Sequence, residues 1–439
     1  MTPITGSTAI EIAACVRTQV SRGDLNPGEV LPPIRVLASR LGVNRNTVAA
    51  AYRQLIAGGI VESGGRRGTS VAGVPDVATV RLPPPELVDL ASGNPDPQFL
   101  PSLVEVIGRV RYQAALYGSP AIDESLLEVA TPMFTEDLTA RQRDWQMVVT
   151  HGAVDAVERV LNAHLTRGDV VAVEDPCFLC SIGTVRLNGY HRIPIAVDER
   201  GITAAGLRSA IVDRGARAII VTPRAHNPTG VSIDDRRAAQ LRRVLAAHPE
   251  VLVIEDDYFS LVSAAPYCGV TPPSTHNWAL VRSVGKILGP DIRVALVATN
   301  ECTAQILGAR LRAGKTWVSH LLQSATAQLL NDRAVANQLE RAREAYALRS
   351  RNLVKALAQH GITPLGRPDG VNLWVPLPDA ESVAATVSHL SAAGWAVQPG
   401  DIFVVDPAHP RHGIRVTSAT LDEDMASDFA AELAQAMGD

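Results

Sequence analysis

Residues 25–71 read LNPGEVLPPIRVLASRLGVNRNTVAAAYRQLIAGGIVESGGRRGTSV, and this stretch decides the fold of the N-terminal part of the chain. After Pro33, apolar residues follow helical spacing as far as Leu41, and Gly42 stops that pattern. Asn44 can then cap a further helix, because an asparagine side chain accepts hydrogen bonds from the first free amides of a helix. The sequence therefore predicts two short helices joined by a tight turn.

The helix after Asn44 has an apolar face and a polar first turn. Val48, Tyr52 and Leu55 face inward at helical spacing, which leaves Arg45, Asn46 and Thr47 exposed at its start. Arginine suits guanine and asparagine suits adenine in the major groove, while a threonine hydroxyl can meet phosphate. The pattern is typical of a DNA recognition helix.

The segments on either side complete a small domain. Ile12, Val16 and Val20 predict an earlier helix that ends before the turn at residues 23–28. After Gly58-Gly59, the run IVESGGRRGTSVA predicts two strands around a glycine-rich turn that contains Arg66 and Arg67. This is the form of a wing, although a small helical cap with a solvated arginine face has the same spacing.

Residues 25–71 closely resemble the winged helix-turn-helix domain of the GntR family. The resemblance implies duplex DNA as a partner and an α+β fold for residues 1–72. It also implies six contact positions on DNA, which are Arg35, Arg45, Asn46, Thr47, Arg66 and Gly68.

A second domain follows, because 439 residues exceed what one hydrophobic core normally holds. Residues 73–87 include three consecutive prolines, which favour an extended linker. In residues 88–439, short apolar runs alternate with helical patterns; these runs are MVVT, VVAV, AIIV, VLVIE, WALV and VALVA. The alternation predicts an α/β domain with a largely parallel sheet covered on both faces.

Lysine is scarce in this chain, since only positions 286, 315 and 355 hold it. Lys286 follows the strand-like run WALV, and strand ends are where open α/β sheets bind ligands. Ser283 and Arg293 flank it at a spacing that can bring a hydroxyl and a guanidinium onto one phosphate. These are parts of a pyridoxal-phosphate (PLP) site, although a lone loop lysine is more often a surface residue.

From about Asp89 to its end, the chain resembles fold type I PLP proteins of the aspartate aminotransferase superfamily. The resemblance implies Lys286 as the Schiff-base lysine, a large part at about 110–310, and a smaller α+β part at about 311–439 with an arm at 88–109. It assigns Asp256 to the pyridine nitrogen, although the adjacent Glu255 and Asp257 leave this uncertain by one residue. The remaining cofactor positions are Ala153, Val154, Phe178, Asn227, Tyr258, Ser283 and Arg293, with Tyr117 reaching the partner subunit.

The same resemblance implies a clasp for an amino-acid carboxylate, made by Gly93, Asn94 and Arg415. The combined architecture resembles the MocR family of regulators. It implies a homodimer, arranged head to tail, with PLP, an amine or an amino acid as effector. The expected function is a PLP-responsive transcription regulator and not an enzyme. Active transamination with an autoregulatory DNA-binding domain is the alternative, and a DNA-binding module with an inert second domain is a third.

Several positions depart from the common family pattern. Asn227 stands where many members have an aromatic residue, and asparagine here is more like a working aminotransferase. Ala153 replaces the usual serine. Ile122 and Leu126-Leu127 replace glycine and a later Leu-Arg, which affects local substrate contacts. The run around Lys286 most resembles the branch connected with vitamin B6 salvage.

Composition limits the remaining possibilities. The 46% hydrophobic and 20% charged fractions are those of an ordinary soluble globular protein, and the net charge of −4 names no partner. No apolar run is long enough to span a membrane and the first residues do not read as a signal peptide, so we expect a cytoplasmic protein. The five scattered cysteines fit reduced thiols, and the Cys177-x-x-Cys180 pair lacks the second pair that a zinc site needs, so no metal is expected.

Overall fold

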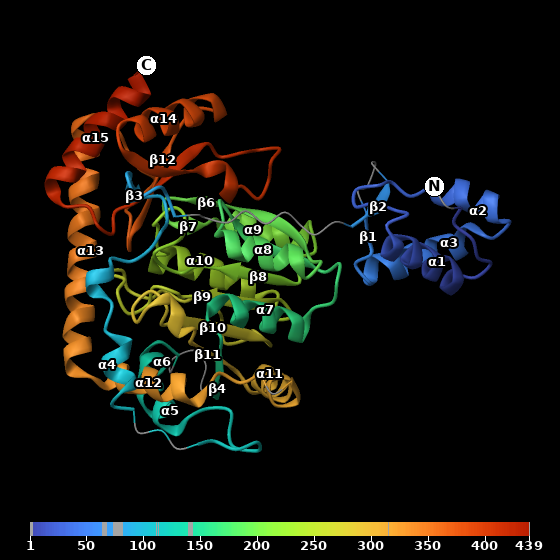
Figure 1. Ribbon diagram of the computed structural model, residues 1–439, viewed down its shortest axis with the longest axis horizontal. Coiled ribbons are helices and arrows are strands. Elements are labelled where there is room, and N and C mark those ends of the chain that lie inside the picture. The colour runs from blue at the N-terminus through green and yellow to red at the C-terminus, as the bar shows by residue number, and fades with distance from the viewer. Residues whose placement is uncertain are drawn as a thin grey trace. The chain divides into compact units, whose positions relative to one another are not determined.

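The computed structural model describes residues 3–63, 68–72, 82–110, 112, 114–138, 144–314 and 316–438. These residues form two compact units, one built on residues up to 77 and the other on most of the remaining chain. Figure 1 labels the helices and strands of both units.

The first unit contains three helices and a two-stranded antiparallel sheet. The helices are α1 (Ala9–Arg22), α2 (Ile34–Leu41) and α3 (Arg45–Ala57), and β1 (Val61–Ser63) pairs with β2 (Thr69–Val71). Thr8 and Glu11 form a capping box at α1, and left-handed Gly23 and Gly42 end α1 and α2. Val48, Tyr52 and Leu55 are buried in one apolar cluster, as their spacing predicts.

The second unit is built on a large sheet with the strand order β4-β11-β10-β9-β8-β5-β6-β7. Its strands are β4 (Trp145–Thr150), β5 (Val170–Asp175), β6 (His191–Asp198), β7 (Gly201–Ile202), β8 (Ala218–Val221), β9 (Leu252–Asp256), β10 (Trp278–Ser283) and β11 (Ala295–Asn300). The pairs β5–β8, β8–β9 and β9–β10 are parallel. β11 runs antiparallel to both of its neighbours, and β7 to β6. The six predicted strand runs thus form β4, β5, β8, β9, β10 and β11.

Helices cover this sheet on both faces. Consecutive residues of β8 and β9 are therefore all buried. Between the strands lie α7 (Ala153–His164), α8 (Leu179–Leu187), α9 (Ala204–Val212) and α10 (Asp235–Ala246), and α11 (Glu301–Gly314) follows β11. Before β4 the chain forms α4 (Leu103–Ile107), α5 (Glu124–Ala130) and α6 (Pro132–Leu138), and α12 (His320–Asn331) packs against α4 and α5.

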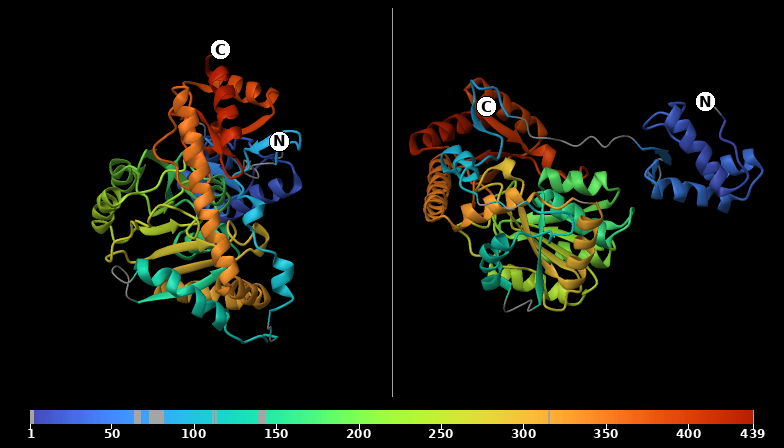
Figure 2. Two further views of the ribbon diagram at one scale, coloured as in Figure 1. Left: turned by 90° about the vertical axis from the view of Figure 1, so that its left-hand side faces the viewer. Right: turned by 60° about the horizontal axis from the view of Figure 1, so that its bottom comes forward.

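A smaller four-stranded sheet has the order β12-β14-β13-β3. It is formed by β12 (Asn372–Pro376), β13 (Trp395–Pro399), β14 (Gly413–Thr417) and β3 (Val88–Leu90), the last of which pairs in parallel with β13. Helices α14 (Ala380–Ala392) and α15 (Glu423–Gly438) pack on it, and the long helix α13 (Arg333–Gln359) leads into it (Figure 2).

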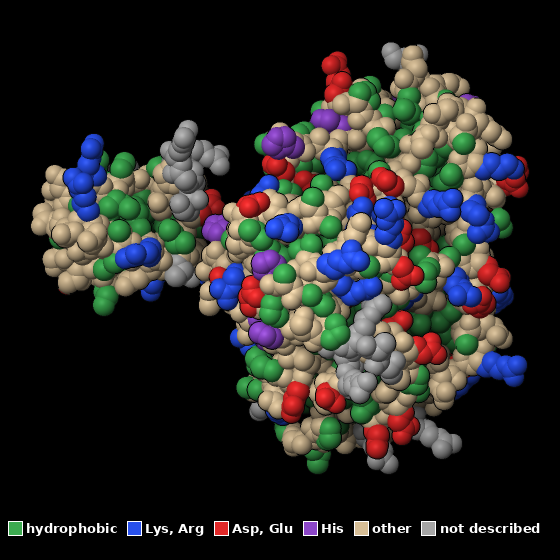
Figure 3. All heavy atoms as spheres, turned by 180° about the vertical axis from the view of Figure 1, so that it is seen from behind, with side chains coloured by type: hydrophobic (Ala, Val, Ile, Leu, Met, Phe, Trp, Pro, Cys, Tyr) green, Lys and Arg blue, Asp and Glu red, His purple; other side chains and the backbone are tan. Residues whose placement is uncertain are grey.

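The surface of the second unit carries both signs of charge. On the face turned to the viewer in Figure 3, basic and acidic side chains are interspersed and do not form a field of one sign. Among the described residues, no helix is both long enough and apolar enough to span a bilayer.

Candidate functional site

The loop after β10 places Lys286 against the segment that follows β3. The Lys286 Nζ atom donates a hydrogen bond to the carbonyl oxygen of Gly93, over 2.7 Å. Burial lowers the pKa of this amine to about 8, and the charge of Arg415 adds to the effect. Near pH 7, the fraction of Lys286 in the neutral, nucleophilic form is therefore larger than that of an ordinary lysine.

Asp256 ends β9 and is buried, yet its Oδ1 atom has no hydrogen-bond partner among the described residues. Its two neighbours are fully engaged. Glu255 accepts hydrogen bonds from Tyr267 and Thr271, while Arg224 and Arg282 both bind Asp257. Burial raises the pKa of Asp256 to about 7, with smaller contributions from Asp257 and Glu174. Of the three adjacent carboxyl groups, Asp256 is the one left with an open oxygen.

A group of donors gathers at the start of α7. Gly152 has a φ of 90° and precedes the helix, whose first turn has no side-chain cap. The amides of Ala153 and Val154 therefore point out of the helix end without an intrahelical partner. A side chain at Gly152 would come within 3.2 Å of the Arg293 guanidinium, which donates to the His151 carbonyl. Such an end, with its amides and a guanidinium, binds phosphate well.

Ser283 stands at the end of β10, where its Oγ atom accepts a hydrogen bond from the Gly285 amide. Phe178 lies between β5 and α8 and is half-buried. The Tyr258 hydroxyl donates to the Ala225 carbonyl over 2.7 Å, and burial raises the pKa of this phenol. These three predicted cofactor positions thus lie at or just after the ends of β5, β9 and β10, of which β9 and β10 are adjacent in the sheet.

Arg415 on β14 is a buried cation without a carboxylate partner among the described residues. Its Nη1 atom donates to Asn227 Oδ1 over 3.1 Å, Nη2 donates to the Ala91 carbonyl, and the guanidinium lies 5.0 Å from the Phe403 ring centre. Burial lowers the pKa of Arg415 to about 10. Because an uncompensated buried charge is costly, an anionic ligand group would be bound strongly here.

Glycine allows the chain to approach this arginine. Gly93 has a φ of 69°, and a side chain there would come within 3.2 Å of Arg415 Nη1. Asn94 is exposed, and its amide donates to Ser92 Oγ. Tyr117 is 78% exposed and packs edge-on against Trp317, with 5.9 Å between ring centres.

The pocket residues fit PLP. Asp256 has a buried oxygen available for a pyridinium nitrogen, the α7 end can take a phosphate, and Lys286 supplies an amine.

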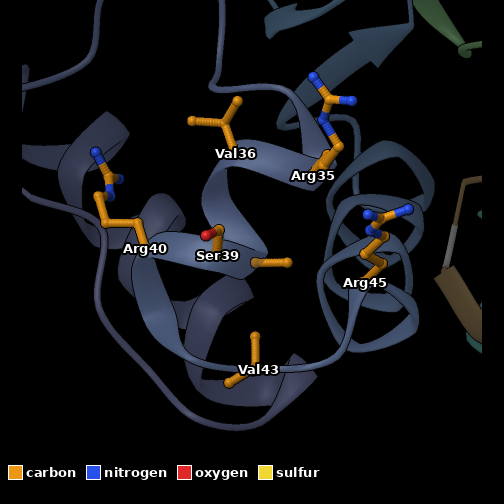
Figure 4. A pocket seen from close by; sticks show the side chains of 7 residues that line it. Arg35, Val36, Ser39, Arg40, Val43 and Arg45 are labelled. Carbon is orange, nitrogen blue, oxygen red and sulfur yellow. The ribbon is translucent and has the colours of Figure 1, made fainter.

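The first unit holds a second candidate site at the start of α3. Asn44 caps this helix by accepting a hydrogen bond from the Asn46 amide over 2.8 Å, and Arg45 and Asn46 are exposed. A cleft of about 700 Å³ opens between α2 and this helix start (Figure 4). It is lined by Arg35, Val36, Ala38, Ser39, Arg40, Val43 and Arg45.

The wing is described only in part. Gly68 has a φ of 91° and a Cβ there would lie 3.4 Å from Val30, so glycine is favoured at this position. Arg66, predicted to contact DNA, and Arg67 lie outside the described residues.

The sequence did not single out several residues near these sites. Glu174 and His226 form a buried pair at 3.2 Å, and Arg224 and Arg282 share Asp257. Both groups join segments that are far apart in sequence, so no local spacing marks them. Arg40, in the first unit, could have been found as a second arginine in the predicted helix that contains Arg35.

Comparison with known families covers almost the whole chain. Residues 8–71 match the bacterial regulatory proteins of the GntR family, and residues 85–433 match the class I and II aminotransferases. The chain belongs to the aminotransferase class I and II family in its second part and carries a GntR-type DNA-binding domain in its first. This fusion defines the MocR type of transcription regulator, as the sequence predicts.

Individual relatives agree with this class. The chain is 44% identical to the vitamin B6 salvage pathway transcriptional repressor PtsJ of Salmonella typhimurium, over 99% of both chains. It is 26% identical to the pyridoxine biosynthesis transcriptional regulator PdxR of Corynebacterium glutamicum, over 75% of this chain and 74% of that protein.

Solved structures agree on the fold of the second unit. The multiple substrate aminotransferase of Thermococcus profundus superimposes with a TM-score of 0.70 at 19% identity, covering 81% of this chain and 92% of that one. The predicted fold class is therefore confirmed: a winged helix-turn-helix is joined to a fold type I, PLP-binding domain. The protein is a GntR-type DNA-binding regulator with an aminotransferase-like domain.

Proposed function

We propose that PLP bound at Lys286 controls the affinity of this regulator for its operator. The open oxygen of Asp256 carries the proposal, because a buried carboxylate without a partner is costly unless a ligand supplies one. When bound, PLP supplies an aldehyde that joins the Lys286 amine as a Schiff base. The other proposed cofactor residues are Ala153, Val154, Phe178, Asn227, Tyr258, Ser283 and Arg293.

The effector beyond PLP is proposed to carry a carboxylate. Arg415 is buried without an acidic partner among the described residues, and the backbone at Gly93 approaches its guanidinium closely. With Asn94 as a further proposed contact, this arrangement favours an amino acid over a simple amine.

The DNA contacts are proposed at Arg35, Arg45, Asn46, Thr47, Arg66 and Gly68. We keep residues 1–72 as the DNA-binding domain, 73–87 as the linker and 88–439 as the ligand-binding domain. PLP can change operator affinity only if it binds two conformations of the protein unequally, for example two that place a pair of winged helices at different separations.

The protein is proposed to act as a homodimer, arranged head to tail. Large apolar side chains that are exposed along one stretch of the chain support this, because exposed apolar surface is often covered by another chain. These side chains belong to Val104, Ile107, Tyr112, Leu116, Tyr117 and Leu127. In such a dimer Tyr117 would reach the phosphate site of the partner subunit. Sedimentation equilibrium at several concentrations tests the dimer directly.

The names of two relatives, one a vitamin B6 salvage repressor and the other a pyridoxine biosynthesis regulator, support control of genes for vitamin B6 metabolism. We propose that the protein acts in the cytoplasm on such genes.

The decisive experiment measures DNA binding by the purified full-length protein to its own upstream intergenic region. The titration is performed with and without PLP while the visible absorbance of the Schiff base is followed. A shift in affinity or footprint on PLP addition supports the proposal. An affinity and a footprint that do not change when PLP is added contradict it.

A second candidate function is transamination. The contact between Arg415 and Asn227 favours it, because both side chains of a working substrate site are present and adjacent. Conversion of PLP to pyridoxamine phosphate, with turnover of a keto acid, is the measurement that would support it.

A further inference from the structure

The cleft between α2 and α3 contains a third arginine that the expected DNA contacts do not include. Arg35, Arg40 and Arg45 all line this cleft, and Ser39 lies between the first two (Figure 4). Arg40 belongs to the last turn of α2, whereas Arg35 belongs to its first. The two side chains therefore enter the cleft from opposite ends of the helix.

Arg35 and Arg40 are five residues apart, so they lie about 140° apart around the helix and border the cleft from two different rows of α2. Residues four apart lie on one face of a helix, which pairs Arg35 with Ser39 and Val36 with Arg40 in two neighbouring rows. Five residues correspond to about 7.5 Å along a helix axis. Two guanidinium groups so placed suit two separate anionic groups better than one shared group.

These cations have no acidic partners in the described part of the chain. No ion pair joins Arg35, Arg40 or Arg45 to a carboxylate, and no acidic residue lines the cleft. Within the unit, Glu11 is engaged by the capping box of α1, and Glu29 accepts a hydrogen bond from the Asn26 amide. The cleft thus presents three arginines that have no carboxylate partner among the described residues, an arrangement that favours an external polyanion.

We propose that Arg40 binds a backbone phosphate of duplex DNA, separate from the phosphate that Arg35 contacts. Arg35 and Arg40 hold α2 on the backbone from both of its ends. This fixes the position from which Arg45 enters the major groove. The inference rests on the proposed DNA contacts and adds to them a positioning residue that reads no base.

A phosphate contact has a measurable signature. Each neutralised phosphate contributes about 0.9 to the slope of log affinity against log salt, because bound counterions are released. Loss of one contact therefore lowers the magnitude of this slope by about 0.9. If the affinities of variant and wild type are equal at 1 M salt, the variant binds about eightfold more weakly at 0.1 M salt. The loss is the same for every sequence, because a phosphate carries no sequence information.

The test measures duplex affinity of the full-length protein between about 0.05 and 0.3 M salt by fluorescence anisotropy. One duplex comes from its own upstream intergenic region, and a scrambled duplex has the same length. Arg40→Ala should lower the slope by about 0.9 on both duplexes, and Arg40→Lys should restore it. Arg22→Ala is the matched control, because Arg22 is an exposed arginine in the last turn of α1 that does not line the cleft.

Three outcomes overturn the inference or its basis. An unchanged slope for Arg40→Ala removes Arg40 from the backbone contacts. A loss confined to the intergenic duplex makes Arg40 a base-reading residue instead. If the wild-type protein binds neither duplex, the proposed regulator function itself fails, which distinguishes that failure from the failure of the Arg40 contact.

Discussion

The amine of Lys286 and the carbonyl oxygen of Gly93 are joined by a 2.7 Å hydrogen bond across 193 residues of sequence. The bond links the loop after β10 to the segment after β3. It holds the amine in a buried place beside Arg415, and both the burial and the charge of Arg415 lower the pKa of the amine. Formation of a Schiff base on Lys286 would take this donor away from Gly93, so ligand binding acts directly on the β3 segment.

Lys286→Ala should abolish the visible absorbance of bound PLP while the far-ultraviolet circular dichroism stays unchanged. The reason is that, among the described residues, Lys286 is the lysine that lies at this site. Lys355→Ala serves as the control, since Lys355 is exposed on α13 and should leave the band intact. A native band in the Lys286 variant would remove this lysine from the site.

The rate of PLP uptake should depend on pH through the Lys286 amine. Its pKa is lowered to about 8, and only the neutral amine attacks an aldehyde. The rate should rise about tenfold per pH unit below about pH 8 and level off above it. Stopped-flow absorbance between pH 6 and 10 measures this, and a rate that keeps rising to pH 10 would contradict the lowered pKa.

Asp256→Asn should stabilise the ligand-free protein and weaken PLP binding. The pKa of Asp256 is raised from 3.8 to about 7 in the folded state, so the folded protein binds more protons than the unfolded chain between these values. Stability of the wild type should therefore fall as the pH rises from about 4 to about 7. Urea unfolding at pH 8 should show the variant to be more stable by about 1–4 kcal/mol. If the wild type and the variant are equally stable at pH 8, burial of the Asp256 carboxylate does not destabilise the folded protein.

Arg415→Gln should selectively weaken the binding of effectors that carry a carboxylate. Removing one partner of a buried charged contact costs at least about 2 kcal/mol, or about 30-fold in affinity. Spectral titration with an amino acid should show this loss, while its decarboxylated amine binds as it does to the wild type. A similar loss for both ligands would assign Arg415 a purely structural role.

Arg45→Ala should weaken binding to the intergenic duplex by about 1–3 kcal/mol if this arginine reads a guanine. The scrambled duplex should be affected less, and the base preference at one position should relax. Competition assays with single-base variants of the duplex measure this. Unchanged affinity and unchanged preference would exclude the contact.

Local signals in the sequence predict much of this structure. Helix α2 ends at Gly42 and helix α3 begins after Asn44, as predicted, because capping and left-handed glycine are encoded within a few residues. The strands of the large sheet follow from short apolar runs between turns. The antiparallel direction of β11 does not, since strand direction depends on the path of the connecting chain.

Long-range contacts explain what sequence reasoning could not decide. Glu255, Asp256 and Asp257 are adjacent and chemically alike, so spacing cannot choose among them. The choice becomes visible only when Arg224 and Arg282, 33 and 25 residues from Asp257, are seen to neutralise it. The parallel pairing of β3 with β13 likewise joins segments about 300 residues apart and has no local signature.

Strand β3 has a mechanical consequence for signalling. The chain that leaves the winged helix enters the second unit at this strand, which is one edge of the small sheet, and Gly93 follows only three residues after Leu90. Gly93, whose carbonyl oxygen accepts the hydrogen bond from Lys286, thus lies directly after an edge strand. A displacement of β3 alone would reach Gly93 without having to be relayed through the core of the large sheet.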